Sequence, residues 1–272
     1  MLSNNLRIGV WIDDLKLGVK AGLKAVAPLR PEIVGLDAFS GELSPRSLTQ
    51  TGRKDLAQFV RARGTTLTTL RADLGGRRLG DREHLDANLS KLREAMQLAA
   101  DLNVRQIVVP AGFIPPADSK NDQTALASLE EGARALVNFS SVLGVRVCWL
   151  AGSEPAATLR DFLNKADSGG AVEVDLNPGT FVMRGEDPLA ALNELSSRIA
   201  MARAVDHYRG GAEAPFGKGD VRWGEVIVGL STLNRNQPID LLAACTLDGD
   251  RMAMLSAAMK RLTTLRQNPL AG

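Results

Sequence analysis

The feature that most constrains the fold of this chain is an alternation of short apolar runs with longer amphipathic segments. The short runs are nearly continuous in their hydrophobicity, which is typical of strands buried on both faces of a parallel sheet. They predict strands at residues 7–12, 32–38, 66–72, 105–111, 146–152, 171–177, 199–205 and 239–245. The segments between and after them predict helices at residues 16–28, 47–63, 85–102, 124–143, 154–166, 188–195, 221–233 and 251–265.

Eight strand-then-helix units in 272 residues are the number that a closed (β/α)8 barrel requires. An open, doubly wound sheet usually has a G-x-G-x-x-G turn after its first strand, but the sequence there reads WIDDLKLG. We interpret the glycine-rich stretch 209–219 as a loop inside the seventh unit and not as a domain boundary. The sequence therefore predicts an α/β protein with a TIM barrel fold, in which residues 1–272 form a single domain.

Composition and charge narrow the classes of partner. The net charge of +2 creates no strong field that would favour nucleic acid or a membrane surface. No run approaches the ~18 apolar residues of a membrane-spanning helix, and the beginning, MLSNNLRIGVW, lacks the pattern of an export signal. We therefore expect a cytoplasmic protein that binds neither nucleic acid nor membranes.

The functional residues of such barrels lie at the C-terminal ends of the strands and in the loops that follow them. At these positions the candidate catalytic residues are Glu154, Asp175, Arg203, Asp206 and His207, and the candidate ligand-binding residues are Trp11, Asp37, Arg71 and Asn177. Asp13 and Asp14 follow the first strand, where they either line the pocket or cap a helix.

The candidate catalytic residues also have structural interpretations. Arg203 either binds a phosphate or carboxylate with its planar fork or forms an ion pair with Asp206 or Asp175. His207 is either an acid–base group, since histidine titrates near neutral pH, or a loop residue in contact with solvent. The sequence leaves both alternatives open.

Two of the ligand-binding candidates, Trp11 and Arg71, also have two possible interpretations each. Trp11 either stacks on a sugar as the floor of a pocket or packs in the core. Arg71 either joins Arg77 and Arg78 in an anion site over the mouth or is a solvated arginine. Both interpretations depend on how the strand ends are arranged in space.

Four segments, in this order along the chain, carry a family resemblance: RIGVWIDDLKLGVKAGL, IVGLDAFSGELSPRSLTQTGRKDL, LREAMQLAADLNVRQIVVPAG and FGKGDVRWGEVIVGL. Together they resemble the xylose isomerase-like TIM barrels, the superfamily of sugar and sugar-phosphate isomerases and epimerases. In the last segment, a loop that closes on the barrel mouth is followed by Gly219, Asp220 and Trp223. The resemblance covers essentially the whole chain and implies that Asp37 contacts the substrate or maintains the pocket.

Members of that family typically hold a divalent cation with Glu, Asp, His and Glu at the ends of the fifth to eighth strands. The resemblance places these positions at about Leu150, at Asn177, at Arg203 or a neighbour, and at Ala244 or Cys245. Aliphatic side chains offer no ligand atoms, a guanidinium brings a permanent positive charge, and one amide cannot hold the ion alone. We therefore predict no metal ion at this centre and no other cofactor.

Two functions follow from the resemblance and from the changed ligand positions. The first is a pseudoenzyme or ligand-binding protein whose ligand is a small polar or anionic molecule, such as a sugar or sugar phosphate. The second is a metal-independent isomerase or epimerase that acts on a sugar, sugar phosphate or keto acid through acid–base residues and Arg203. Fold alone does not decide between them, but the changes at all four ligand positions favour the first. Barrels of this kind often pair through their outer helices, so the resemblance is compatible with a homodimer.

Overall fold

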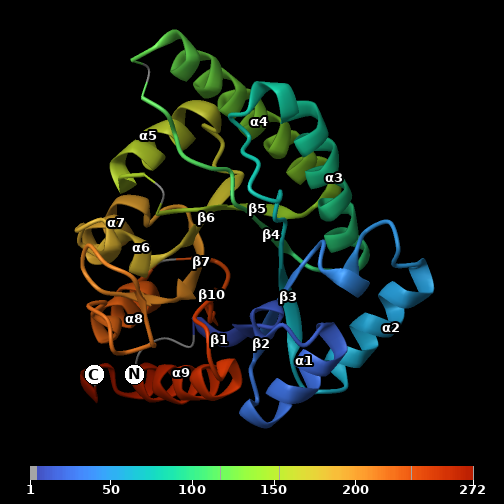
Figure 1. Ribbon diagram of the computed structural model, residues 1–272, viewed down its shortest axis with the longest axis vertical. Coiled ribbons are helices and arrows are strands. Elements are labelled where there is room, and N and C mark those ends of the chain that lie inside the picture. The colour runs from blue at the N-terminus through green and yellow to red at the C-terminus, as the bar shows by residue number, and fades with distance from the viewer. Residues whose placement is uncertain (1–4, 117, 153, 234, 272) are drawn as a thin grey trace.

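The parallel strands close into a ring in the computed structural model, which describes residues 5–116, 118–152, 154–233 and 235–271 (Figure 1). The strands are β1 (Leu6–Trp11), β2 (Ile33–Asp37), β3 (Thr66–Arg71), β4 (Gln106–Val109), β5 (Arg146–Leu150), β6 (Val172–Leu176), β7 (Ile199–Ala204) and β10 (Ile239–Ala243). They follow one another around the ring in chain order, and β10 pairs with β1. All eight predicted strands are confirmed to within two residues at each end, and the closed ring confirms the TIM barrel.

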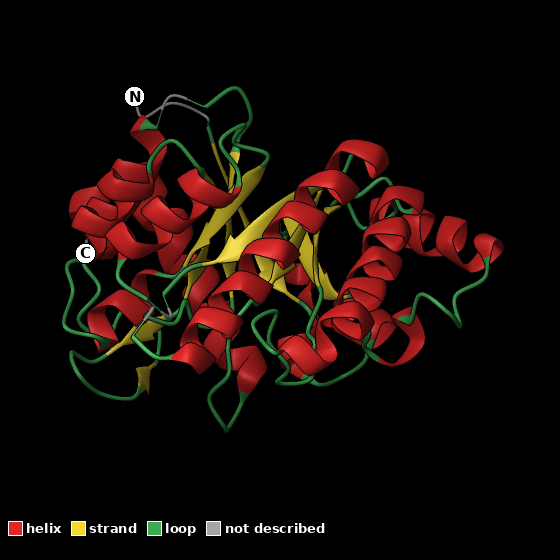
Figure 2. Ribbon diagram, turned by 90° about the horizontal axis from the view of Figure 1, so that it is seen from above, coloured by secondary structure: helices red, strands yellow, loops and turns green. Residues whose placement is uncertain are grey.

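The helices cover the outside of the ring (Figure 2). They are α1 (Val19–Val26), α2 (Gln50–Arg61), α3 (Leu85–Asp101), α4 (Lys120–Leu143), α5 (Ala156–Ala166), α7 (Pro188–Leu195), α8 (Trp223–Thr232) and α9 (Arg251–Gln267). Each matches a predicted helix. Helix α4 begins four residues earlier than predicted, because the Ser119 side chain accepts a hydrogen bond from the backbone N–H of Asp122 and caps the helix.

Several short elements were not predicted. Helix α6 (Pro178–Met183) starts directly after β6, with proline at its first position. The predicted loop after the seventh strand contains the antiparallel pair β8 (Asp206–His207) and β9 (Glu213–Ala214). The 3-10 helices are η1 (Asp13–Leu15), η2 (Ala27–Leu29), η3 (Gly41–Leu43), η4 (Arg82–His84) and η5 (Pro269–Ala271).

The interior of the barrel is layered, because successive side chains of a strand point to opposite faces. The middle layer is an apolar cluster that contains Trp11, Ile33, Val108, Cys148, Met201 and Leu242. The Trp11 ring fits there because Gly35 has no side chain: a Cβ on Gly35 would lie 2.5 Å from a ring carbon. Polar side chains lie on both sides of this layer, towards the strand starts and towards the strand ends.

None of the described helices combines the length and the apolar character needed to cross a membrane.

Candidate functional site

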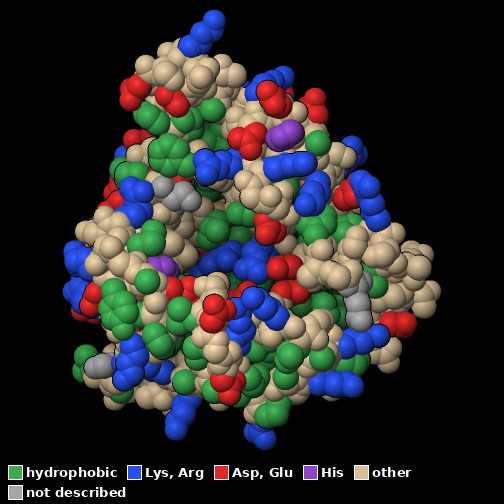
Figure 3. Space-filling model, in the orientation of Figure 1, with side chains coloured by type: hydrophobic (Ala, Val, Ile, Leu, Met, Phe, Trp, Pro, Cys, Tyr) green, Lys and Arg blue, Asp and Glu red, His purple; other side chains and the backbone are tan. Residues whose placement is uncertain are grey.

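Two arginine–aspartate pairs meet at the strand ends, which we call the barrel mouth. At the ends of β2 and β3, the Arg71 Nε and Nη2 atoms donate to the two carboxylate oxygens of Asp37 at 2.6 and 2.8 Å. At the ends of β6 and β7, Arg203 Nε donates to Asp175 Oδ2 at 2.6 Å. Figure 3 shows basic side chains in the central hollow of this face, with acidic side chains beside them. The mouth therefore carries fixed charges of both signs.

The Trp11 ring lies against both guanidinium groups. The Cζ atoms of Arg71 and Arg203 are 5.0 and 5.2 Å from its centroid, which is within the range of a cation–π contact. The Trp11 side chain is 0% exposed, so its ring cannot form the floor of an open sugar pocket. Core packing is therefore its role in this structure, and the ring positions the two arginines.

Asp13 and Asp14 connect the mouth strands to one another. Asp13 accepts hydrogen bonds from the backbone N–H of Asp37, at 2.7 Å, and from the Ser40 hydroxyl. Asp14 accepts from Arg71 at 3.3 Å and from the backbone N–H of Cys245 at 3.0 Å. Neither aspartate makes a side-chain cap hydrogen bond to η1, so the helix-capping alternative does not describe them.

The charged side chains at the mouth do not form a binding site for an anion. The carboxyl groups of Asp13, Asp14, Asp37 and Asp175 face the guanidinium groups of Arg71 and Arg203. Burial is the largest influence on Asp13, Asp14 and Asp175, and it raises the pKa of each. Both arginines already bind carboxylates, and Arg71 is only 19% exposed and is not the solvated residue of the alternative interpretation.

Three buried polar atoms at the mouth have no hydrogen-bond partner in the described part of the chain. They are Asp175 Oδ1, Asn177 Oδ1 and Arg203 Nη2, which come from neighbouring strand ends. A buried polar atom left in this state costs about 1–3 kcal/mol, so such atoms in native proteins usually meet water or a ligand. The β6–β7 side of the mouth therefore offers two hydrogen-bond acceptors and one donor to a polar ligand.

Asp206 and His207 have a different surrounding. The Asp206 carboxylate accepts backbone N–H bonds from His207, Gly217 and Val221 at 3.0, 2.8 and 3.2 Å, and so holds the loop after β7 in place. His207 is only 8% exposed, which does not match the alternative of a loop residue in contact with solvent. It packs against α6: a Cβ added to Gly179 would lie 2.6 Å from His207 Nδ1, which has no hydrogen-bond partner among the described residues.

Glu154 is buried but is not part of the arginine–aspartate group at the mouth. Its side chain is 1% exposed, and neither carboxyl oxygen has a hydrogen-bond partner among the described residues. Burial raises the pKa of Glu154 to about 8, while the nearby charges that act on it belong to Arg184 and Glu186. The structure thus brings together Asp37, Arg71, Asp175 and Arg203, with Asn177 two residues after Asp175 at the start of α6. It places Glu154, Asp206 and His207 in separate surroundings.

The residues present do not fit the divalent cation typical of the resembling family. Leu150 and Ala244 pack against the apolar middle layer and offer no ligand atoms. Arg203 places a positive charge beside the only carboxylate of β6 that points towards the mouth, Asp175. Across the described ranges, no three His, Cys, Asp or Glu side chains are arranged to hold a metal ion.

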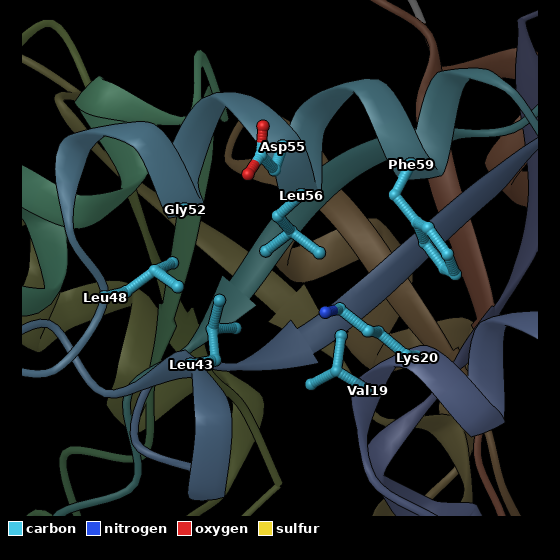
Figure 4. Close-up of a pocket in the computed structure, with 8 residues that line it drawn as sticks. All are labelled: Val19, Lys20, Leu43, Leu48, Gly52, Asp55, Leu56 and Phe59. Atoms are coloured by element: carbon cyan, nitrogen blue, oxygen red, sulfur yellow. The ribbon is translucent and has the colours of Figure 1, made fainter.

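A separate apolar cavity of about 320 Å³ lies between α1 and α2 (Figure 4). It is lined by Val19, Lys20, Leu43, Leu48, Gly52, Asp55, Leu56 and Phe59. None of the predicted site residues reaches it. The mouth therefore remains the candidate site for polar chemistry.

The comparisons with known proteins agree with this architecture. A family model described as a xylose isomerase-like TIM barrel matches residues 15–241. The chain belongs to the xylose isomerase-like TIM barrel family. A search of curated proteins gives no match.

Solved structures of the same fold include sugar epimerases. A xylose isomerase domain protein from Planctomyces limnophilus is 20% identical, over 98% of this chain and 100% of that one, with a TM-score of 0.83. A D-psicose 3-epimerase crystallised with D-fructose is 15% identical, over 97% of each chain, with a TM-score of 0.70. The 3-keto-D-glucoside 4-epimerase from E. coli is 14% identical, over 95% of this chain and 99% of that one, with a TM-score of 0.73. At these identities, the likenesses show a shared fold and no more.

Proposed function

We propose that this protein binds a small polyhydroxylated molecule, a sugar or a sugar derivative, at the barrel mouth without the help of a metal ion. The observation that carries the proposal is the set of unpartnered atoms Asp175 Oδ1, Asn177 Oδ1 and Arg203 Nη2. A hydroxyl group both donates and accepts hydrogen bonds, so two or three neighbouring hydroxyls match a mixed set of acceptors and donors. A purely anionic ligand would satisfy only the donor and would meet the unpaired carboxylate oxygen.

The class of ligand is also supported by the relatives in fold. The structures that resemble this chain include a D-psicose 3-epimerase and a 3-keto-D-glucoside 4-epimerase, which are named for sugar substrates. The chain departs from a metal-dependent epimerase at the mouth, because Leu150 and Ala244 cannot coordinate an ion and Arg203 is already paired with Asp175. A binding protein or pseudoenzyme is therefore the function that the mouth supports best.

A metal-independent isomerase or epimerase is the second candidate, and one observation favours it. Burial raises the pKa of Asp175, and a carboxyl with a raised pKa is better matched to proton transfer near neutral pH. Arg203 beside it could stabilise the negative charge of an enolate. Transfer of deuterium from solvent to the carbon next to the carbonyl of a ketose would distinguish this enzyme from a binding protein.

Calorimetric titration of EDTA-treated protein with neutral ketoses, aldoses and their phosphate esters tests the proposal. We expect saturable binding of at least one neutral sugar, unchanged when Mn²⁺ or Mg²⁺ is added. Asn177→Ala removes the Oδ1 acceptor, which has no partner among the described residues, and should weaken binding roughly tenfold. Asn138→Ala, an exposed position on α4, is the matched control. Binding that disappears in EDTA, or that Asn177→Ala leaves unchanged, would refute the proposed site.

A further inference from the structure

The opposite end of the barrel, where the strands start, contains a second polar cavity. Its volume is about 210 Å³, and its lining includes Arg7, Arg105, Arg146 and Asp240. The strand starts lie on the far side of the ring from the mouth (Figure 2). The apolar middle layer around Trp11 separates this cavity from the mouth, so the two ends are independent sites.

A buried polar network holds two of these arginines in place. Arg7 Nε donates to Asp240 Oδ1 at 2.8 Å, and Arg146 Nη2 donates to the Gln106 amide oxygen at 3.1 Å. Gln106 in turn donates to Asp240 Oδ2 at 3.1 Å, which connects the two halves of the network across the barrel. Arginines fixed in this way lose little side-chain freedom when they bind a ligand.

The third arginine is free of this network. Arg105 is exposed, and its Nη1 atom donates to the neutral amide oxygen of Gln237 at 3.4 Å. Arg7 and Arg146 are also 37% and 32% exposed, so each can offer donors to the cavity while it keeps its internal partner. The cavity wall therefore carries three guanidinium groups around one ligand-sized space.

Positive charge exceeds negative charge at this end. Among the cavity-lining residues, three arginines face the single carboxyl group of Asp240. Including Glu173 and Arg235, which join the network through Arg146, gives four arginines and two carboxyl groups. Interiors of such barrels are usually filled by aliphatic layers, and a plug that only closed the barrel would need no surplus of charge. The surplus of two matches a doubly charged anion.

We propose that this cavity binds a small dianionic oxyanion, a phosphate or a dicarboxylate, through Arg7, Arg105 and Arg146. Guanidinium groups bind such oxygens through charge-assisted hydrogen bonds. The mouth has the opposite balance, with more carboxyl than guanidinium groups, so this end is where an anion would be attracted. The site does not depend on the sugar-binding function proposed for the mouth.

Calorimetry and thermal unfolding with inorganic phosphate, succinate and sodium chloride at matched ionic strength test this site. We expect saturable binding of one dianion per chain and a higher unfolding temperature than in chloride, and the comparison of phosphate with succinate shows which oxyanion is preferred. Arg105→Gln should weaken the binding roughly tenfold. Arg134→Gln, which removes an exposed charge from α4, is the matched control and should bind normally.

A second variant keeps the arginines and blocks the site. Gln237→Glu places a carboxylate next to Arg105 at an exposed position, so it should compete with the ligand and abolish binding while the protein stays folded. Circular dichroism and the unfolding temperature in chloride report on folding for both variants. Equal stabilisation by phosphate and chloride, or unchanged dianion binding in folded Arg105→Gln and Gln237→Glu, would overturn the proposal.

Discussion

We expect Glu154 to make the stability of this protein depend strongly on pH, and we expect its replacement with glutamine to remove that contribution. Its carboxyl group is 1% exposed, with no hydrogen-bond partner for either oxygen in the described part of the chain. Burial raises the pKa of Glu154 from its ordinary value of 4.5 to about 8, and the charge of Arg184 offsets only part of this effect. Glutamine has nearly the same shape and is never ionised.

The sign and size of the effect follow from these two pKa values. Between pH 4.5 and 8, the folded chain holds a proton on Glu154 that the unfolded chain has released, so the free energy of unfolding falls as the pH rises. The stability is fully present below pH 4.5 and is lost as the pH passes through 8. The gap between the pKa values corresponds to about 5 kcal/mol in total, and on the order of 3 kcal/mol of it is lost between pH 5 and pH 8.

Urea denaturation of the native protein and of Glu154→Gln at intervals between pH 5 and pH 9 measures this difference. We expect the variant to gain stability relative to the native protein steadily with pH, while its denaturant dependence stays the same. Glu83→Gln, at an exposed position in η4, is the matched control and should follow the native curve. Parallel curves for the native protein and Glu154→Gln would refute the reasoning, because they would mean that Glu154 titrates normally in the fold.

Three further predictions concern the mouth and the loop beside it. Arg203→Met leaves the Asp175 carboxyl buried without its ion pair, and should lower the free energy of unfolding by about 3–5 kcal/mol at pH 8. The loss should be smaller at pH 5, where Asp175 can protonate. Equal losses at the two pH values in urea denaturation would contradict this. Asp206→Ala removes the acceptor of three backbone N–H groups and should lower the free energy of unfolding by on the order of 3 kcal/mol. Proteolysis between residues 207 and 221 should become faster. An unchanged cleavage pattern would show that the carboxylate does not hold the loop. Dialysis against EDTA should leave the thermal unfolding midpoint unchanged, since the mouth residues do not fit a divalent cation, and a fall in the midpoint that Mg²⁺ or Mn²⁺ restores would disprove this.

Much of the fold could be predicted because buried parallel strands have a simple sequence pattern. The runs that became β5 and β7 are apolar along most of their length, and both strands lie inside a ring of helices. Helix α6 was missed because six residues are too few to show a helical period, and its first residue is a proline. The β8–β9 pair was missed because two-residue strands have no pattern of alternation.

The positions of the mouth residues could be predicted, but most of their contacts could not. The sequence offers Arg203 two possible ion-pair partners, Asp175 and Asp206. Alternation along the neighbouring strands β6 and β7 brings the Asp175 and Arg203 side chains together in the barrel, whereas Asp206 belongs to the hairpin that follows. The same alternation could have identified Arg71 as an inward-pointing strand residue beside Asp37. The sequence leaves the solvated alternative open because the burial of Arg71 depends on contacts with residues from separate strand ends.

Other features depend on packing that no local pattern reveals. The burial of His207 requires the close approach of Gly179 in α6, and the hydrogen bond from the Cys245 backbone to Asp14 joins opposite ends of the chain. Asp13 and Asp14 connect the end of β1 to β2, to β3 and to the segment that follows β10. Their position after the first strand was a signal, but only the closed ring shows which strands they join.

The Asp175–Arg203 contact shows what would distinguish a ligand that is only bound at the mouth from one that also reacts there. Arg203 Nε binds Asp175 Oδ2, which leaves Oδ1 as the oxygen that a hydroxyl or an acidic C–H group could meet. A guanidinium stabilises a ligand through its fixed positive charge and its hydrogen bonds, but it has no vacant orbital with which to coordinate an electron pair as a metal ion does. A proton transferred to Oδ1 would be held by a carboxyl whose pKa burial has raised. A ligand that only satisfies Oδ1 and the Arg203 Nη2 atom is bound, whereas catalysis further requires a carbon acid placed within reach of Oδ1.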